Sequence, residues 1–301
     1  MKYFYLLYII SYPSIAAITD YHPYDRTNEW FFVSSIELQK TEIQVLEGSE
    51  LTPRKTTHSQ FISEIIAKKI NDKIFAGVML NYNIIEQLPL QYGISDNSTY
   101  KRKGFAEPTF AVNIRTKTAK KEGDSNVDLY FSFTPSLIQR KTNHSNSNNF
   151  VGRNILKAGL THQLSYTDWV YTFDGNYTYL TEGKEKASFS ESSNINLNAS
   201  SEAIARFEGR YNLSDFFWLK LGIGLRYIEE TSFQIDNKKS TITQGTGTYH
   251  ILGIMYQVNA KELWDFSLER FRNDYNVQGL ESTTQGDYTQ YSYILKFIHF
   301  I

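Results

Sequence analysis

The chain has 301 residues and a formal net charge of −1, and 15% of its residues are aromatic. It contains no cysteine, which excludes a disulfide framework and a thiolate metal site. The near-neutral charge gives no reason to expect nucleic acid as a partner. No run of 18 apolar residues occurs, which argues against transmembrane helices. Membrane-spanning strands stay compatible with this composition, because alternating apolar and polar residues average to mild hydrophilicity.

The first seventeen residues differ in character from the rest of the chain. Lys2 precedes the uncharged apolar run 3–12, which is followed by a proline and by small residues that include Ala16. A short positive segment, an apolar segment and an A-x-A-like site are the parts of a secretory signal peptide. We expect residues 1–17 to be a signal peptide cleaved after Ala16 or the next residue, and residues 18–301 to be the mature domain. A buried N-terminal strand is the alternative.

From Trp30 onward, apolar and polar residues alternate with a period of two. Successive side chains of a strand point to opposite faces, so such a strand has one apolar and one polar face. Residues 217–227 are the clearest run, because Lys220, Gly222, Gly224 and Arg226 share a face opposite an unbroken apolar face. This run of eleven residues has the length that crosses a bilayer at a tilt of about 45°.

The same alternation predicts twelve strands. They lie at 30–39, 58–70, 73–84, 105–117, 126–138, 151–165, 168–181, 200–213, 216–229, 247–258, 262–272 and 287–301. Long polar loops are expected at 40–57, 86–104, 139–150, 182–199, 230–246 and 273–286. The remaining connections between the strands are short turns, apart from one of intermediate length at 118–125.

Alternating short turns and long loops are typical of an outer-membrane barrel, with the short turns in the periplasm. An unpaired backbone group in hydrocarbon costs several kcal/mol, so the sheet has to close on itself. We therefore expect one all-β domain, a closed antiparallel transmembrane up-and-down barrel of about twelve strands in the outer membrane of a Gram-negative bacterium. An even number of strands leaves both termini in the periplasm.

If the apolar faces contact lipid, the opposite faces line the lumen, which side chains need not fill in a barrel of this size. The predicted lumen-facing charges include Glu64, Lys68, Arg115, Asp128, Asp265, Glu269 and Lys296. The lumen-lining candidates for solute passage are Arg153, Lys157, Arg206, Glu208, Arg210, Lys220, Arg226, Asp174 and Glu107. The cations among these candidates form a candidate positive patch that would attract an anionic solute. The alternative is an interior in which Glu208, Asp174 and Glu107 neutralise the cations.

The sequence shows no catalytic constellation. On a strand, a serine nucleophile and its histidine base need same-face spacing, and none of His58, His144 and His162 has a serine two residues later. The six histidines have no metal-ligand spacing, and no glycine-rich phosphate loop follows a strand into a helix. We therefore expect no catalytic residue, no metal and no cofactor.

The segment 104–110, Gly-Phe-Ala-Glu-Pro-Thr-Phe, resembles the G-x-x-D-P-T-L stretch of the meta-pathway phenol-degradation-like outer-membrane transporters. These are relatives in architecture of the long-chain fatty-acid channels. Glu107 stands where that family has an aspartate, and the order of strands and turns stays similar to about residue 228. The resemblance implies passage of small, often aromatic or hydrophobic compounds, and no binding residue is carried over from it.

These patterns favour a porin-like channel or transporter through which small solutes diffuse passively. One alternative is a non-transporting surface barrel that serves as receptor, adhesin or subunit of an envelope assembly, and another is a lipid-modifying outer-membrane enzyme. The expected partners are outer-membrane lipid and lipopolysaccharide, small solutes, the barrel-assembly machinery during biogenesis and other envelope proteins.

Overall fold

The computed structural model describes residues 30–47, 50–51, 55–87, 100–118, 123–138, 140–141, 152–186, 194–235, 238–243, 245–259, 261–278 and 283–300. Twelve long strands form the wall of a barrel: β1 (Trp30–Glu47), β3 (Lys55–Asn71), β4 (Ile74–Gln87), β6 (Thr109–Lys117), β7 (Ser125–Thr134), β9 (Ile155–Ser165), β10 (Trp169–Leu180), β13 (Ser200–Ser214), β14 (Phe217–Ile228), β17 (Gly245–Asn259), β18 (Glu262–Gln278) and β19 (Thr283–Phe300). Seven shorter strands extend the sheet: β2 (Glu50–Leu51), β5 (Tyr100–Phe105), β8 (Arg140–Lys141), β11 (Gly183–Lys186), β12 (Asn194–Leu197), β15 (Thr231–Ile235) and β16 (Lys238–Thr243).

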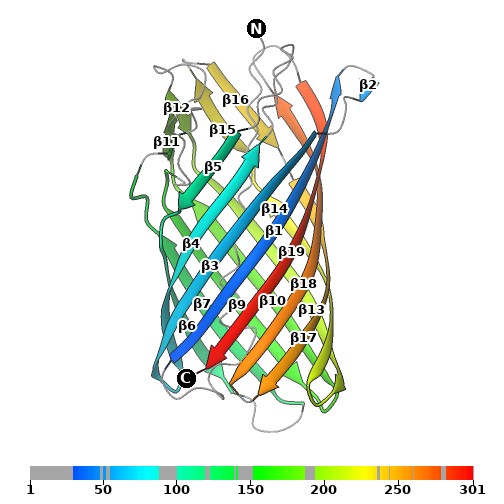
Figure 1. Cartoon of the computed structure of the whole chain (residues 1–301). Coiled ribbons are helices and arrows are strands. Elements are labelled where there is room, and N and C mark those ends of the chain that lie inside the picture. Colours follow the sequence, from blue (N-terminus) through cyan, green and yellow to red (C-terminus); the bar gives the residue numbers. More distant parts are fainter. Residues whose placement is uncertain are drawn as a thin grey trace.

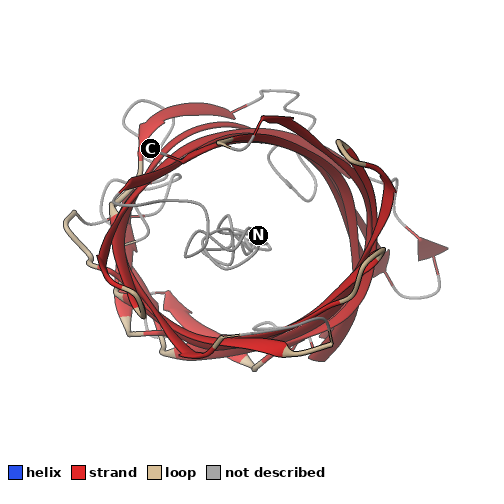
Figure 2. Cartoon of the chain, turned by 90° about the horizontal axis from the view of Figure 1, so that it is seen from below, coloured by secondary structure: helices blue, strands red, loops and turns tan. Residues whose placement is uncertain are grey.

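The twelve long strands pair antiparallel in chain order, each with its two neighbours. β19 then pairs with β1, from Phe31↔Phe300 to Leu46↔Gln285, and this pairing closes the ring. Figure 1 shows the strands tilted against the barrel axis, and Figure 2 shows the closed ring along that axis. Closure removes the sheet edges that hydrocarbon does not tolerate. The predicted closed antiparallel barrel of about twelve strands is confirmed.

The two ends of the barrel differ in their connections. At one end, two residues link β3 to β4, three link β9 to β10 and two link β13 to β14. At the other end the connections are longer and carry the seven short strands (Figure 1). We call these two ends the short-turn end and the long-loop end. β1 begins and β19 ends at the short-turn end. The predicted alternation of turns and loops is confirmed, and the periplasmic position of the termini stays a prediction. The expected signal peptide, residues 1–17, lies outside the described residues.

Several strands are longer than the alternation predicts. β1 continues to Glu47 and β18 to Gln278, and β11–β12 and β15–β16 form antiparallel pairs at the long-loop end. These segments are short or carry only scattered apolar residues, so period-two hydrophobicity gives a weak signal although the backbone still pairs. The predicted loops that contain strand are 40–57, 86–104, 139–150, 182–199, 230–246 and 273–286.

Three predicted strands are shorter or interrupted in the structure. The segment predicted at 105–117 is broken at 106–108, between β5 and β6. Pro108 has no N–H to donate to a neighbouring strand, which accounts for the break. Likewise, β7 ends before 138 and β9 begins after 151. None of the described residues forms a helix with the length and hydrophobicity needed to cross a membrane.

The apolar faces of the strands point away from the barrel. On β14, Leu221, Ile223 and Leu225 are 50–62% exposed, whereas Lys220 and Arg226 are buried. The eleven residues 217–227, tilted by about 40°, span roughly 25 Å, which is the height of the apolar band on membrane barrels. This outward-facing band is therefore tall enough to match the hydrocarbon core of a bilayer.

Aromatic side chains border this band. Near the short-turn end, Trp169 stacks on Tyr171 with ring centroids 5.7 Å apart, and Trp264 contacts Phe297 at 4.9 Å. Near the long-loop end, the outward-facing Tyr179 and Tyr227 lie one residue from the ends of their strands. Such aromatic girdles sit at the two membrane–water interfaces of a barrel.

The inner wall is apolar on one side near the short-turn end. A buried cluster is formed there by Phe31, Val33, Ile65, Ala67, Phe75, Met79, Ala111, Met255, Leu263, Ile298 and Phe300. Because these residues face inward, the alternate positions of the same strands face outward. Glu64 and Lys68 therefore lie on the outer face of β3, and their predicted position in the lumen is wrong.

Candidate functional site: the central cavity

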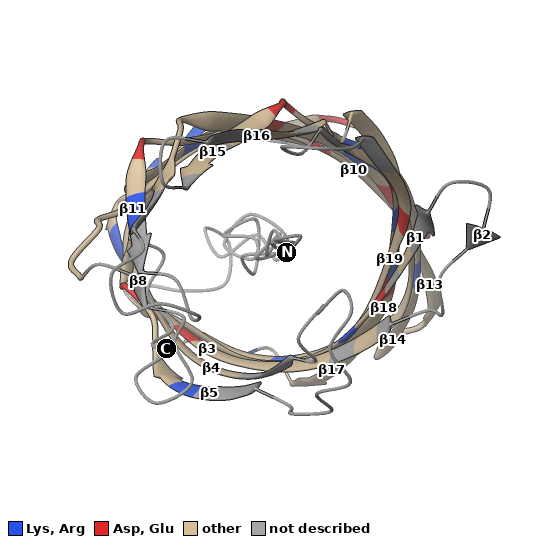
Figure 3. Ribbon diagram, turned by 90° about the horizontal axis from the view of Figure 1, so that it is seen from above, with Lys and Arg blue, Asp and Glu red and all other residues tan. Residues whose placement is uncertain are grey.

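A central cavity lies inside the barrel, and about 1500 Å³ of space in and around it, including open solvent, is free of protein atoms. Every one of the twelve wall strands contributes to its lining through alternate positions, as with Val33, Ser35 and Glu37 on β1. Figure 3 shows acidic and basic residues distributed around the ring of strands. The lining therefore combines hydroxyl, amide and charged side chains with apolar ones.

Six of the nine lumen-lining candidates border this cavity: Lys157, Asp174, Arg206, Glu208, Lys220 and Arg226. The other three lie toward its two ends. Arg210 is near the short-turn end of β13, whereas Glu107 and Arg153 precede β6 and β9 at the long-loop end. Glu107 accepts the backbone N–H of Gly152 at 3.4 Å, and Arg153 donates to Ser200 Oγ at 3.3 Å.

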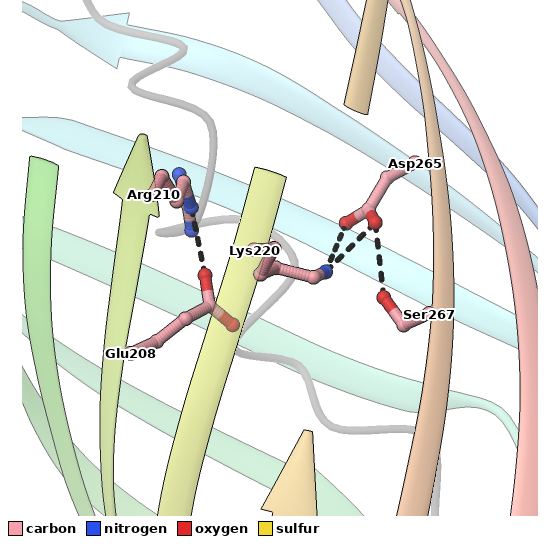
Figure 4. Close-up of polar contacts among 5 residues, drawn as sticks. All are labelled: Glu208, Arg210, Lys220, Asp265 and Ser267. Carbon is pink, nitrogen blue, oxygen red and sulfur yellow. Dashed lines mark hydrogen bonds and ion pairs between the residues drawn. The ribbon is translucent and has the colours of Figure 1, made fainter. Parts of the chain in front are cut away.

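Four of the six cations of the expected positive patch are paired with carboxylates. Arg206 lies 3.3 Å from Asp174, and Arg210 lies 2.7 Å from Glu208. Lys220 binds Asp265 at 2.7 Å, as Figure 4 shows together with the Arg210–Glu208 pair. Arg226 donates from Nε to Glu202 at 3.0 Å. These four pairs correspond to the neutralised interior rather than to a continuous positive patch, because each positive charge has a negative charge within contact distance.

Asp174 is the centre of a hydrogen-bond network. Its carboxylate accepts from Tyr130 Oη at 3.0 Å, from Thr161 Oγ1 at 3.1 Å and from Asn176 Nδ2 at 3.3 Å, in addition to Arg206. Hydrogen bonds that involve an ionised group are stronger than neutral ones, and bonds in one network reinforce each other. The network therefore holds Arg206 against the wall and out of the lumen axis.

The ring of Tyr130 lies flat over Gly159 on the neighbouring strand. The two residues are direct partners in the β7–β9 register, and a Cβ at Gly159 would overlap the ring of Tyr130. An aromatic ring that covers a glycine across a strand pair fixes the register and fills the space of the missing side chain. Gly159 therefore leaves room for a side chain of the neighbouring strand.

A separate buried pair joins Arg115 of β6 to Asp128 of β7 near the short-turn end. Arg115 donates from Nε at 2.8 Å and from Nη2 at 3.1 Å, and both side chains are almost completely buried. This two-pronged geometry is the strongest form of an arginine–carboxylate contact. The pair ties β6 to β7 where the connecting link between them is longest among the turns of this end.

Glu37 and Glu202 line the cavity and Tyr130 donates to Asp174, but none of these three residues is among the predicted candidates. Each has the same parity as recognised inward positions on its strand, since Tyr130 lies between Asp128 and Ser132 and Glu202 precedes Arg206 by four residues. Period-two parity was therefore sufficient to find them. Among the residues that the structure describes, no group of three or more His, Cys, Asp and Glu side chains is placed to hold a metal ion.

No family model matches the sequence, and no curated protein matches it. Among solved structures, an outer membrane channel from Pseudomonas putida F1 aligns with a TM-score of 0.61 at 11% identity, covering 91% of this chain and 97% of that chain. The transport unit of the autotransporter AIDA-I from Escherichia coli aligns with a TM-score of 0.53 at 7% identity, covering 92% of this chain and 91% of that chain.

At these identities the likeness concerns the fold. This chain has the fold of bacterial outer-membrane β-barrels, in agreement with the expected location in the outer membrane. The two similar proteins are a channel and a transport unit, and neither is described as an enzyme. The narrower resemblance to the phenol-degradation-like transporters stays a prediction.

Proposed function

We propose that the chain is an outer-membrane channel through which small solutes diffuse passively. The observation that carries this proposal is the central cavity, which takes lining residues from every wall strand. Twelve strands enclose a lumen that side chains alone need not fill. The polar lining offers hydrogen-bond partners to water and to polar solutes in place of bulk solvent.

The paired charges predict weak selectivity between simple cations and anions. Of the ten ionisable Asp, Glu, Lys and Arg residues that line the cavity, five are acidic and five are basic. A lumen with balanced charge attracts neither sign strongly, whereas a ring of one sign does. The expected attraction of anionic solutes is therefore not part of the proposal.

Conductance across a planar bilayer tests the channel directly. The refolded protein is expected to give discrete ohmic currents in potassium chloride, and proteoliposomes are expected to swell in small sugars. The absence of both currents and swelling from correctly folded barrels would count against a channel.

The lack of cysteine provides a matched control. Ser292 lines the cavity, and the next residue, Tyr293, is outward-facing and 46% exposed. A charged thiol reagent is expected to reduce the current through a Ser292→Cys variant. The same reagent is expected to leave a Tyr293→Cys variant unchanged, because that thiol faces lipid and the reagent is confined to water.

The second candidate function is a non-transporting surface barrel, such as a receptor, adhesin or envelope-assembly subunit. The specific observation in its favour is the sheet extension at the long-loop end, where β12 pairs with β15 and β16 with β18. A rim of paired strands presents a more defined surface than separate loops do. A sealed lumen in the conductance experiment, together with a folded rim, would favour this function.

The proposal also covers the surroundings of the barrel, its partners and its export. We propose outer-membrane lipid and lipopolysaccharide as the surroundings of the outward apolar band, the barrel-assembly machinery as a partner in biogenesis, and other envelope proteins as possible contacts at the rim. We also propose removal of residues 1–17 during export, which mass spectrometry of the mature N-terminus tests. A channel with no enzymatic activity is the simplest form of the proposal.

A further inference from the structure

Four charged groups of the cavity wall lie outside the ion pairs described above: Lys157, Glu37, Glu269 and Lys296. Lys157 of β9 makes no hydrogen bond or ion pair with any described residue, and its Nζ lies 5.9 Å from the centroid of the Tyr130 ring. Glu269 of β18 likewise has neither among the described residues. Glu37 of β1 accepts hydrogen bonds from Gln39 at 3.3 Å and from the side chain of Ser292, and it forms no ion pair within the part of the chain that the structure describes.

The two glutamates lie on one side of the cavity. β19 separates their strands, and Glu269 pairs in register with Ser292 while Glu37 pairs with Ile294. Lys296 of the same β19 also lines the cavity, but its register partners are Asp265 and Ser35. The carboxylates of Glu37 and Glu269 therefore flank β19 two and four residue positions beyond Lys296, so that two acidic groups and one basic group lie on this side.

Lys157 lies on the opposite wall at the same height. Around the closed ring, β9 is the sixth strand from β1 and β19 is the twelfth, so the two strands are diametrically opposed. Glu37 and Glu269 are seven residues, and Lys157 is eight residues, from the short-turn end of their strands. All three line the same cavity. The structure thus places negative and positive groups face to face across the lumen.

Glu37 and Glu269 are too far from Lys157 for direct contact, so these groups act through an electric field across the lumen. Twelve strands about 4.8 Å apart, tilted by about 40°, enclose a ring roughly 24 Å across, which the side chains narrow from both walls. Arg206 of β13 and Arg226 of β14 lie on strands that follow β9 around the same wall, but Asp174 and Glu202 neutralise them there. Between low-dielectric walls, the remaining opposed charges focus a transverse field on the solute path.

We propose that this opposition makes the channel selective for small zwitterionic solutes. An ammonium group of the solute turns toward Glu37 and Glu269, and its carboxylate turns toward Lys157. An uncharged solute gains nothing from the field, and a solute with net charge is attracted by one wall and repelled by the other. This inference rests on the proposed function as a channel and names the class of solute that it favours.

Proteoliposome swelling with two solutes of similar size tests the inference. γ-Aminobutyrate is the zwitterion and erythritol is the uncharged reference, and the measured quantity is the ratio of their swelling rates. The Lys157→Gln and Glu269→Gln variants are each expected to lower this ratio about fivefold, the value of one charge at contact distance in water. Lys157→Arg keeps the charge and is expected to keep the ratio.

Reversing the field distinguishes orientation of the solute from a loss of structure. In a variant that combines Lys157→Glu with Glu37→Gln and Glu269→Lys, the acidic and basic walls exchange places. A zwitterion turns over in the reversed field, so the ratio is expected to return toward that of the natural protein. Heat-modifiable migration in gel electrophoresis checks that each variant is folded.

The outcomes separate this inference from the channel itself. If both solutes enter and the Lys157→Gln and Glu269→Gln variants keep the natural ratio, the zwitterion selectivity is overturned and the channel stands. If neither solute enters vesicles that contain folded barrels, the channel is overturned and the selectivity with it. A lowered ratio in both single variants, restored in the reversed variant, supports the inference.

Discussion

Lys220 of β14 reaches across β17 and binds both carboxylate oxygens of Asp265 on β18, with Nζ–O distances of 2.7 and 2.8 Å. Gly253 is the residue of β17 opposite Lys220, and a Cβ there would lie 2.8 Å from Cε of the lysine. Ser267 adds a hydrogen bond to Asp265 at 3.0 Å. Three consecutive strands are therefore tied together by one ion pair that lies along the inner wall (Figure 4).

Removing one partner of this pair is expected to destabilise the barrel more than removing both. Asp265 is only 2% exposed, so Lys220→Met leaves a buried carboxylate without its cation, at a cost of about 3–5 kcal/mol. The double variant Lys220→Met/Asp265→Asn removes that charge and is expected to recover most of the loss. The free energy of unfolding by urea in lipid vesicles, followed by tryptophan fluorescence, measures both.

A solvent-exposed ion pair is the control for this prediction. Arg272 lies 3.2 Å from Asp287, and both side chains are substantially exposed. Arg272→Gln is expected to change the free energy of unfolding by less than about 1 kcal/mol, because water screens such pairs. Equal losses in Lys220→Met and the double variant would contradict coupling between Lys220 and Asp265.

Gly159→Ala is expected to displace the ring of Tyr130 and to break its hydrogen bond with Asp174. The added methyl group would occupy the space of the ring, and such overpacking costs about 1–3 kcal/mol. Gly175→Ala is the matched control on the adjacent strand, because its Cβ meets Phe173 at an ordinary 3.4 Å. Unfolding in vesicles compares the two, and equal stability of both variants would argue against the packing role of Gly159.

The twelve wall strands were predictable because their outward faces contact a uniform apolar medium. That medium imposes the same alternation on strands that are far apart in sequence, as on β10 and β14. At the long-loop end, β11 and β16 carry few apolar residues. There, backbone pairing is decided by neighbouring strands and leaves no periodic trace in the sequence.

The alternation did not determine which residues face the lumen where both faces of a strand carry apolar residues. On β3, Phe61, Ile65 and Ala67 face inward, whereas Ile62 and Ile66 share the outer face with Glu64. The rule that charges face the lumen therefore assigned Glu64 to the wrong side. The apolar cluster near the short-turn end, which depends on contacts among six or more strands, was not visible in any one strand.

The partners of the lumen cations depended on register, which the alternation does not determine. Glu202 pairs in register with Ile228, two residues from Arg226, and this diagonal brings the two side chains together. Asp265 is two strands away from Lys220, beyond a glycine that has no side chain to intervene. Sequence identified Arg226 and Lys220 as inward-facing, and only the ladder of strand pairs identified what neutralises them.

Ile223→Arg is expected to destabilise the barrel strongly in a bilayer. Ile223 is outward-facing, 62% exposed and in the middle of the apolar band on β14. A lipid-facing arginine near the bilayer midplane costs about 2–4 kcal/mol. Asp215→Arg, in the short turn that precedes β14, is the control and is expected to have little effect because it lies in water. A tolerated Ile223→Arg would mean that this face does not contact hydrocarbon.

Glu64→Leu is expected to stabilise the barrel in vesicles, in contrast to most substitutions of a hydrogen-bonded residue. The Glu64 carboxylate lies on the outer face, accepts a hydrogen bond from Ser34 at 2.8 Å and has the exposed Ile62 and Leu80 nearby. A carboxylate in hydrocarbon is unfavourable, so its removal is expected to raise the free energy of unfolding by about 1–2 kcal/mol.

Glu64→Gln separates the two contributions at this position. It removes the charge and keeps an acceptor for the Ser34 hydroxyl, so an intermediate gain is expected when unfolding is measured in the same vesicles. Because a single copy in pure lipid has no other molecule beside Glu64, a gain from Glu64→Leu there identifies the lipid as the cause of the penalty. A loss of stability from Glu64→Leu in that setting would show instead that the Ser34–Glu64 bond outweighs the cost of placing a carboxylate in hydrocarbon.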